Sequence, residues 1–319
     1  MPKILVTGAT GFIGGHFCDF LLQNNLGEVH IVKRYRSPFE GLSTIIDSDQ
    51  VKLYECDLHD FSATYRVLDE IRPDYVFHFA AQSSVGSSWR YPITTLLDNI
   101  KMQANLLEAL HVLHQTPKVW VAGTSEEYGI TRQEDLPIKE DFPLHPLSPY
   151  AVSKVTQEMM AYQYHASQKL PIFIARSFNI EGPRRPEAFV ISSFAKQIVQ
   201  IEKHGLEPVI KVGNLEARRD FVDVRDAVRA YWLTVDKGEP AMPYNIASGK
   251  SYSIQEVLDI LISFSKTKVT TQQDPERMRP SEVLERTGDS SRLQGLGWKP
   301  EIAFEQTLRD TLDYWREHA

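Results

Sequence analysis

The sequence has few cysteines, no excess of positive charge and no long apolar run. Only two of its 319 residues are cysteine, and its net charge is −7 with a pI of about 5.8. Nucleic acids and anionic membranes attract basic surfaces, so this charge argues against both as partners. No apolar stretch reaches the roughly 20 residues of a membrane-spanning helix. His and Cys are not spaced as in a metal site, so we expect no metal.

The cysteine positions favour a reducing compartment. Cys18 falls in a predicted helix and Cys56 in a predicted strand, and nothing before the first strand resembles a signal peptide. We therefore expect two buried, reduced thiols in a cytoplasmic protein.

Short runs rich in Val, Ile and Phe alternate with stretches of helical periodicity, the pattern of a parallel sheet covered by helices on both faces. The runs are KILVT, EVHIVKR, VKLYECDL, YVFHFAA, KVWVAGT, IFIARSF and, far downstream, PYNIASG. The expected fold class is α/β, a doubly wound parallel (Rossmann) sheet with a smaller, interleaved C-terminal substrate lobe. We assign residues 1–180 and about 220–250 to the cofactor domain, and about 181–219 and 251–319 to the smaller lobe.

A glycine-rich turn follows the first strand directly. Gly8, Gly11 and Gly14 are spaced three apart, and a helix is predicted to begin near Phe12. Glycines let the backbone approach a pyrophosphate, while the first N–H groups of the helix point at the anion. The spacing alone is weak because a tight strand-to-helix turn also uses glycine, but its place after a buried strand favours a dinucleotide site.

The end of the second strand indicates which dinucleotide binds. An NAD-specific site usually has a carboxylate there for the ribose 2′-hydroxyl. This sequence has Lys33, Arg34 and Arg36 instead. Cations suit a 2′-phosphate, so we expect NADP; the alternative is a solvated basic loop.

Two segments contain candidate catalytic side chains, although a Tyr-x-x-x-Lys pair by itself is mostly structural. In SPYAVSKVTQEMMAYQ, Tyr150 and Lys154 are four residues apart and share one helix face. After a dinucleotide turn, this pair resembles that of the extended short-chain dehydrogenase/reductase superfamily. There the ammonium is expected to lower the pKa of the Tyr150 phenol for proton exchange with a sugar hydroxyl.

The second segment, VAGTSEEYG, follows the fifth strand at the edge where such sheets expose their active sites. Thr124 is the expected third member of the catalytic set. Dehydrogenation needs no acid beyond it, yet Glu126 is present two residues later. Glu126 is therefore either a base in the same cavity or an ordinary helix-capping or solvated surface residue.

The arrangement resembles the nucleotide-sugar 4,6-dehydratases over nearly the whole chain. AAQSSVGSSW, FNIEGPRRPEAFV, VGNLEARRDF and RPSEV are similar to cofactor and sugar-nucleotide segments of GDP-mannose 4,6-dehydratases. The resemblance implies catalysis by Thr124, Glu126, Tyr150 and Lys154. It implies that the cofactor also contacts Phe12, Ile13, Asp57, Leu58, Ala80, Ala81 and Gln82. It implies a sugar-nucleotide site with Asn179, Val190, Arg219, Arg279 and Glu282.

Other segments resemble a neighbouring family. AFVISSFAKQIVQIE and DFVDVRDAVRAYW are more similar to GDP-4-keto-6-deoxymannose reductases. The expected function is dehydration of GDP-mannose to GDP-4-keto-6-deoxymannose through transient NADP reduction. The alternatives are NADPH-dependent reduction of that product and a catalytically idle nucleotide-binding regulator. The resemblance also implies a homodimer or homotetramer through helices near 92–114 and 150–168, where Met159, Met160 and Tyr162 are candidates for the interface.

Overall fold

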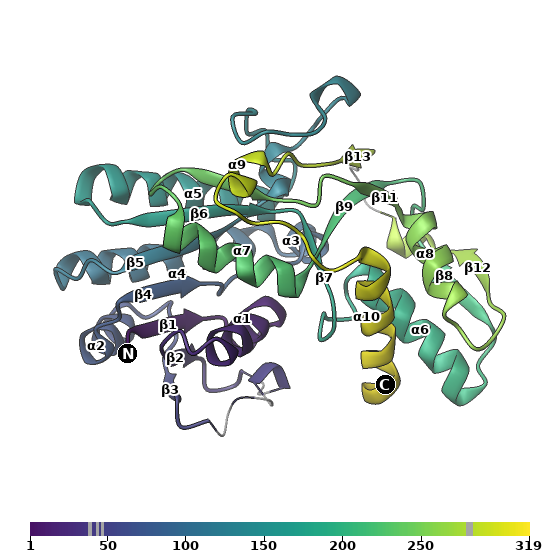
Figure 1. Cartoon of the computed structure of the whole chain (residues 1–319), viewed down its shortest axis with the longest axis horizontal. Helices are drawn as coiled ribbons and strands as arrows, with labels where there is room; N and C mark the ends of the chain where they lie inside the picture. The colour runs from purple at the N-terminus through teal and green to yellow at the C-terminus, as the bar shows by residue number, and fades with distance from the viewer. Residues whose placement is uncertain (38–39, 43–44, 46–47, 279–282) are drawn as a thin grey trace.

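The computed structural model describes residues 1–37, 40–42, 45, 48–278 and 283–319. A large parallel sheet runs through one side of the molecule, and a smaller lobe built around α6 (Val190–His204) lies beside it (Figure 1). The sheet confirms the seven predicted strands. In spatial order they are β10 (Pro243–Ile246), β6 (Ile172–Ser177), β5 (Lys118–Thr124), β4 (Tyr75–His78), β1 (Lys3–Thr7), β2 (Glu28–Lys33) and β3 (Val51–Glu55).

Helices cover both faces of this sheet, as its apolar strands require. One face carries α1 (Phe12–Gln23) and α7 (Val224–Lys237). The other carries α2 (Phe61–Ile71), α4 (Pro92–Val112) and α5 (Pro149–Gln168). The short helix α3 (Val85–Arg90) packs against α4 and α5. The parallel order with helices on both sides confirms the expected fold class.

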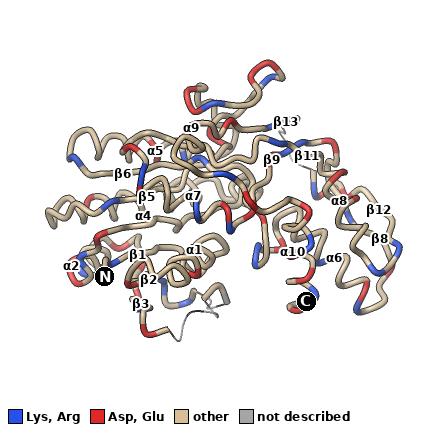
Figure 2. Tube along the Cα trace, viewed as in Figure 1, with Lys and Arg blue, Asp and Glu red and all other residues tan. Residues whose placement is uncertain are grey.

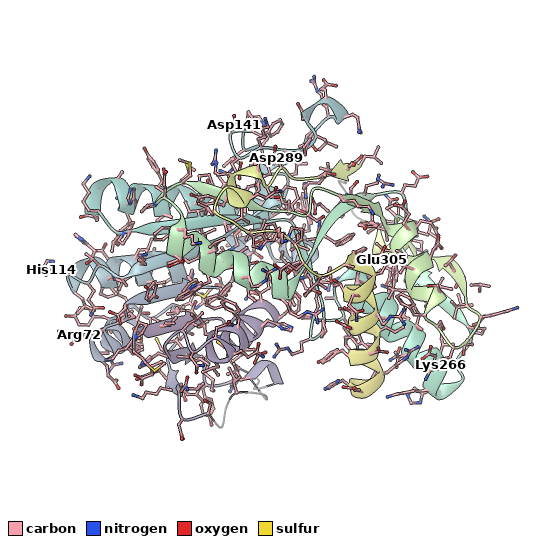
Figure 3. The ribbon with its side chains drawn as sticks, in the orientation of Figure 1. Arg72, His114, Asp141, Lys266, Asp289 and Glu305 are labelled. Atoms are coloured by element: carbon pink, nitrogen blue, oxygen red, sulfur yellow. The ribbon has the colours of Figure 1, made fainter. Side chains whose placement is uncertain are left out.

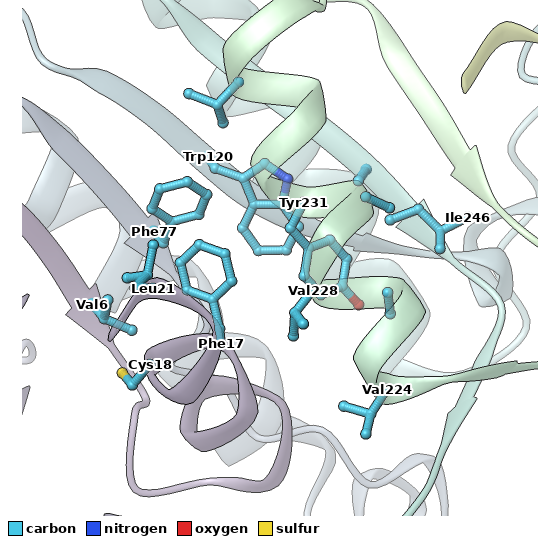
Figure 4. Close-up of a cluster of buried hydrophobic side chains, with 14 of the residues drawn as sticks. Val6, Phe17, Cys18, Leu21, Phe77, Trp120, Val224, Val228, Tyr231 and Ile246 are labelled. Atoms are coloured by element: carbon cyan, nitrogen blue, oxygen red, sulfur yellow. The ribbon is translucent and has the colours of Figure 1, made fainter. Parts of the chain in front are cut away.

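Aromatic side chains fill the layer beneath α1 and α7. Phe17 of α1 lies 4.3 Å from Phe77 of β4 between ring centroids, and Trp120 of β5 lies 4.5 Å from Tyr231 of α7 (Figure 4). All four rings are buried. This core joins the strand that precedes the glycine turn to the strands that end at the catalytic segments, so the two regions are fixed relative to one another.

The chain leaves the large sheet after β6 and returns to it as β10. Between them, β7 (Asn179–Glu181) pairs with β9 (Arg218–Asp223) in a second sheet, which β11 (Ser251–Ser253) and β13 (Glu285–Arg286) complete. A separate apolar core holds the smaller lobe together. Its remaining elements are β8 (Val209–Val212), α8 (Ile254–Ser263), β12 (Thr270–Gln273) and α10 (Phe304–His318). Short elements elsewhere are η1 (Glu40–Leu42), η2 (Ser125–Tyr128), η3 (Gln133–Asp135), η4 (Pro275–Arg277) and α9 (Ser291–Gln294).

Charges of both signs are mixed over the large sheet and the smaller lobe (Figure 2). Among the described residues, no helix is long and apolar enough to span a membrane. Both cysteines are buried free thiols, and Cys56 lies just past the end of β3 rather than within it. Charged side chains such as Arg72 and Lys266 lie at the outer edge of the molecule, away from the strand ends that face the second sheet (Figure 3).

Candidate active site

The glycine turn between β1 and α1 has the shape of an anion cradle. Gly8 has a φ of +71°, and a Cβ there would lie 2.6 Å from the backbone nitrogen of Ala80. A Cβ on Gly14 would lie 2.3 Å from the carbonyl oxygen of Gly8. Gly11 caps α1 without a side-chain hydrogen bond, and the first turn of the helix carries no acidic residue. The first N–H groups of α1 therefore face the turn without a competing side chain, which fits a pyrophosphate.

A cavity continues from this turn along the carboxyl ends of β1, β2 and β4. Its lining includes most of the side chains predicted to contact the cofactor: Gly8, Arg34, Asp57, Leu58, Ala80, Ala81 and Gln82. Phe12 and Ile13 begin the adjacent helix. These residues lie along one cavity at the carboxyl edge of the sheet, whereas Gly11, Gly14, Tyr150 and Lys154 are not among its lining residues, and the cofactor contacts remain predictions.

Arg34 is exposed at the rim, and the carboxylate of Asp57 lines the same cavity. Burial opposes ionisation of Asp57, but hydrogen bonds from His59 and the charge of Arg34 hold its pKa below the usual range. The Lys33 ammonium donates to the carbonyls of Arg34 and Tyr35 at 3.3 and 3.5 Å, so it also braces the loop. A ligand here meets the Arg34 cation and the Asp57 anion together.

The first turns of α5 position Tyr150 and Lys154. Ser148 caps the helix by accepting from the N–H of Ala151, and Pro149 occupies its first position. The Lys154 ammonium lies 6.0 Å from the centroid of the Tyr150 ring and donates to the carbonyl of Ala122 at 3.0 Å. Both side chains are at least nine-tenths buried.

The expected electrostatics of this pair are wrong for the protein chain by itself. Burial raises the pKa of Tyr150 above its usual value, and the charges of Glu127 and Glu126 raise it further. A hydrogen bond with the Thr124 hydroxyl and the charge of Arg185 lower it, without reversing the shift. Burial also lowers the pKa of Lys154 to about 8. Desolvation, which sequence reasoning left out, is the largest influence on the pKa of both groups.

A tight turn after β5 places the two neighbouring glutamates in different surroundings. The Glu127 carboxylate is fully buried and accepts from the N–H of Thr124 at 2.7 Å, while the Thr124 hydroxyl accepts from the N–H of Glu126 at 3.3 Å. Glu127 therefore forms the capping box that was the alternative role for Glu126. The Glu126 side chain is 25% exposed, and its charge reaches Tyr150.

Sequence reasoning missed Arg286. Its Nη1 donates to Oε1 of Glu126 at 2.6 Å, and its side chain is only 3% exposed. The two residues are 160 positions apart in the chain, so neither a motif nor a helical spacing connects them.

Two of the predicted substrate residues lie on adjacent strands of the second sheet. Asn179 of β7 donates to the carbonyl of Asp220 at 3.1 Å, and Arg219 of β9 donates to the carbonyl of Val283 at 2.8 Å. Val190 begins α6. The other two predictions, Arg279 and Glu282, lie outside the described residues.

The geometry therefore brings an anion cradle, a Thr–Tyr–Lys set and a carboxylate to one edge of the sheet. The family model of GDP-mannose 4,6-dehydratase matches residues 5–311. The chain belongs to this family. The family resemblance read from the sequence is thereby confirmed.

Two similar proteins of the family are named for two different reactions. The GDP-6-deoxy-D-mannose reductase of Pseudomonas aeruginosa is 33% identical, covering 98% of this chain and 97% of the relative. The GDP-mannose 4,6-dehydratase of Vibrio cholerae is 32% identical, covering 95% and 91%. Both activities predicted from the sequence are thus found among its relatives.

A solved structure supports the fold at the same level. The structure of RMD from Pseudomonas aeruginosa complexed with NADPH superposes with a TM-score of 0.86 at 30% identity, and all of both chains is covered. Other similar structures are nucleotide-sugar epimerases and dehydratases. The short-chain dehydrogenase/reductase fold predicted from the sequence is confirmed.

The low pKa of Lys154 predicts that this residue lowers stability. With a folded pKa near 8 against 10.5 unfolded, burial of the charge opposes folding in full at about pH 7, and the penalty fades as pH rises from about 8 to 10.5. Lys154→Met should therefore raise the free energy of unfolding at about pH 7 by roughly 1–3 kcal/mol, measured by urea denaturation.

The gain in the free energy of unfolding caused by Lys154→Met should shrink when the same measurement is made at about pH 10. Lys169→Met, which changes an exposed lysine just after α5, serves as the matched control and should alter stability by less than about 0.5 kcal/mol. If Lys154→Met is less stable than wild type at about pH 7, burial of the Lys154 charge does not oppose folding.

Proposed function

We propose that this protein is an NADP-dependent GDP-mannose 4,6-dehydratase. The observation that carries the proposal is the Glu126 carboxylate, which stands beside Thr124 and Tyr150 without serving as the cap of the turn. Oxidation of a sugar hydroxyl needs only Thr124, Tyr150, Lys154 and a nicotinamide. A carboxylate added to that set supplies the proton transfers that elimination of water requires.

The cofactor site fits NADP. The glycines leave room for a pyrophosphate against α1, and Arg34 at the rim provides a guanidinium for a 2′-phosphate. Held by these residues, NADP would supply the hydride transfer that removes hydrogen from C4 of the sugar and returns it to C6. Every proton transfer falls to the side chains of this chain.

The ionised Tyr150 takes the proton from the O4 hydroxyl while Thr124 hydrogen-bonds to it. The positive charge of a bound oxidised nicotinamide would oppose the rise that burial causes in the Tyr150 pKa. Lys154, held by the Ala122 carbonyl, supplies the nearby positive charge. The resulting C4 ketone makes the C5 proton acidic. Glu126 removes that proton and delivers a proton to the C6 hydroxyl, which leaves as water. Two proton transfers by one carboxylate return Glu126 to its starting state. As the hydride returns to C6, C5 takes up a proton, and release of the O4 proton held by Tyr150 balances it and restores the ionised phenol.

The smaller lobe supports binding of the GDP portion. Asn179 and Arg219 lie on adjacent strands of the second sheet, which faces the carboxyl ends of the large one. We place the sugar nucleotide between residues 1–180 with about 220–250 and the lobe of about 181–219 and 251–319. Arg279 and Glu282 remain predicted contacts.

NADPH-dependent reduction of GDP-4-keto-6-deoxymannose is the second candidate. In a reductase, the ion pair between Glu126 and Arg286 would serve only to join the smaller lobe to the turn after β5. The reductase of Pseudomonas aeruginosa also matches this chain over nearly its whole length. A reductase would use Tyr150 as an acid toward the ketone and would need no base at C5.

Exposed apolar side chains on α4 and α5 support a homodimer. Ile93 is 70% exposed, Leu97 61%, Tyr162 57% and Met159 48%. The two helices pack against each other, so their outer surfaces form one face, whereas Met160 is partly buried against the core. A second copy covering this face would remove these side chains from water. A homotetramer would require a further surface.

The function is tested by Glu126→Gln. The variant should still oxidise C4 at a rate within about tenfold of wild type, because Thr124, Tyr150 and Lys154 remain. It should lose water at least about 10²-fold more slowly, since the base is gone. Rapid mixing with GDP-mannose should therefore show reduced nicotinamide accumulating on the enzyme, with little 4-keto-6-deoxy product by mass spectrometry.

Glu134→Gln is the matched control, because Glu134 is an exposed acid in η3 after the same strand. It should behave as wild type. If instead wild type leaves GDP-mannose intact and consumes NADPH with the 4-keto-6-deoxy sugar, the reductase candidate is correct.

Arg34→Ala tests the choice of dinucleotide. Loss of a charge-assisted hydrogen bond to the 2′-phosphate should weaken NADP binding by about 10- to 100-fold and change NAD binding by less than about 3-fold. Isothermal titration with each cofactor gives both values. Arg72→Ala, at the opposite end of the sheet just before β4, is the control. Equal weakening of both cofactors in Arg34→Ala would contradict the assignment.

Leu97→Glu tests the dimer face. A charge in the centre of an apolar contact should convert the dimer to monomer at micromolar concentration, as measured by sedimentation velocity. Leu206→Glu changes an equally exposed leucine beyond α6 and should leave the mass unchanged. A wild-type monomer, or a Leu97→Glu dimer, would exclude this face.

A further inference from the structure

The ion pair between Arg286 and Glu126 joins the smaller lobe to the catalytic turn. We propose that Arg286 is a positioning residue for the proton transfers at C5 and C6, a role that rests on the proposed dehydratase function. Nη1 of Arg286 donates to Oε1 of Glu126 at 2.6 Å. Arg286 does not itself exchange a proton, because a guanidinium stays charged in proteins.

The backbone holds Arg286 in this place. β13 pairs with β9 so that Arg286 stands opposite Arg219, and Nη2 of Arg286 also contacts the carbonyl of Gly129 at 3.4 Å. The N–H of Ile138 donates to the carbonyl of Thr287 at 2.8 Å, so the segment after β13 is fixed along the loop that follows β5. Backbone contacts therefore fix the position of Arg286, and its guanidinium holds the Glu126 carboxylate.

Packing alone does not explain an arginine here. The side chain is 3% exposed, and its Nε is buried without a hydrogen-bond acceptor in the part of the chain that the structure describes. An apolar residue of similar size is often as stabilising as a buried ion pair or more so, and a buried unpaired donor carries a further cost. This position tolerates that cost, which indicates a function for the charge.

The charge matters at both proton transfers. As a base, Glu126 must be ionised and fixed beside C5, and the ion pair does both. The C5–H bond breaks, the proton goes to Glu126, and the electron pair forms the C5–C6 double bond as the C6–O bond breaks. Once protonated, Glu126 sits beside a cation that favours loss of the proton, so it passes readily to the departing hydroxyl. Water leaves and the ion pair is restored.

The experiment compares Arg286→Met, Arg286→Lys, Glu126→Gln and the double variant Arg286→Met with Glu126→Gln. Formation of reduced nicotinamide after mixing with GDP-mannose reports C4 oxidation. Product formed in deuterium oxide, analysed by mass spectrometry, reports the steps at C5 and C6. Arg316→Met removes another Arg–Glu pair, with Glu202, in the smaller lobe and is the matched control.

We expect Arg286→Met to oxidise C4 within about 3-fold of wild type and to form product about 10²-fold more slowly. Arg286→Lys should recover part of the loss, and the double variant should be no slower than Glu126→Gln alone, because the two residues act as one unit. Should Arg286→Met not fold, Arg286→Lys decides: a slower elimination with unchanged C4 oxidation supports the proposal.

If C4 oxidation and water elimination slow equally in these variants, Arg286 only supports the fold. If the double variant is slower than Glu126→Gln by the factor that Arg286→Met causes alone, the two residues act independently. Either result overturns the proposal. If wild type eliminates water and Arg286→Met does so at the same rate, the role of Arg286 is overturned but the dehydratase function stands. A wild-type protein that does not act on GDP-mannose rejects the dehydratase function itself, so the two failures are distinguishable.

Discussion

The catalytic edge depends on one buried hydrogen bond, from the N–H of Thr124 to the carboxylate of Glu127. Burial and the negative charge of Glu158 raise the pKa of Glu127, while Arg176 opposes the shift. The Arg176 guanidinium binds Glu158 through Nε at 2.9 Å and Nη2 at 2.5 Å. One cation thus faces two buried acids, and the raised pKa of Glu127 favours its protonated form. This arrangement fixes the turn that presents Thr124 and Glu126.

The rest of the site follows from that turn. β5 ends at Thr124, beside the first turns of α5, so a fixed turn sets the hydroxyl relative to Tyr150. The same turn directs Glu126 to the smaller lobe, where Arg286 receives it. A site divided in this way is complete only when both lobes contribute, which suits an enzyme that must exclude bulk water while a reactive enone exists.

Local patterns in the sequence predicted much of this arrangement. Spacing within short segments can be read directly from the sequence, and it predicted the turn at Gly8, Gly11 and Gly14, the seven strands and the Tyr150–Lys154 pair. The burial of a side chain cannot be read in this way. The raised pKa of Tyr150 and the lowered pKa of Lys154 arise from desolvation by side chains distant in sequence.

Contacts between residues far apart in the sequence could not be predicted either. Arg286 meets Glu126 only because β13 pairs with β9 and the following segment docks along the loop after β5. The division of labour between Glu126 and Glu127 required the geometry of the turn, since both are acids beside the same strand. The carboxyl-end rule located the edge of the sheet, but it did not determine which side chain faces which.

The central claim is a closed redox cycle, in which the hydride removed from C4 returns to C6 of the same sugar. The most direct measurement mixes GDP-mannose that has deuterium at C4 with GDP-mannose that has carbon-13 and no deuterium, and adds purified enzyme without NADPH. In a closed cycle, deuterium appears at C6 only in molecules that lack carbon-13. Deuterium at C6 of the carbon-13 molecules, or no conversion until NADPH and a keto sugar are supplied, would contradict it.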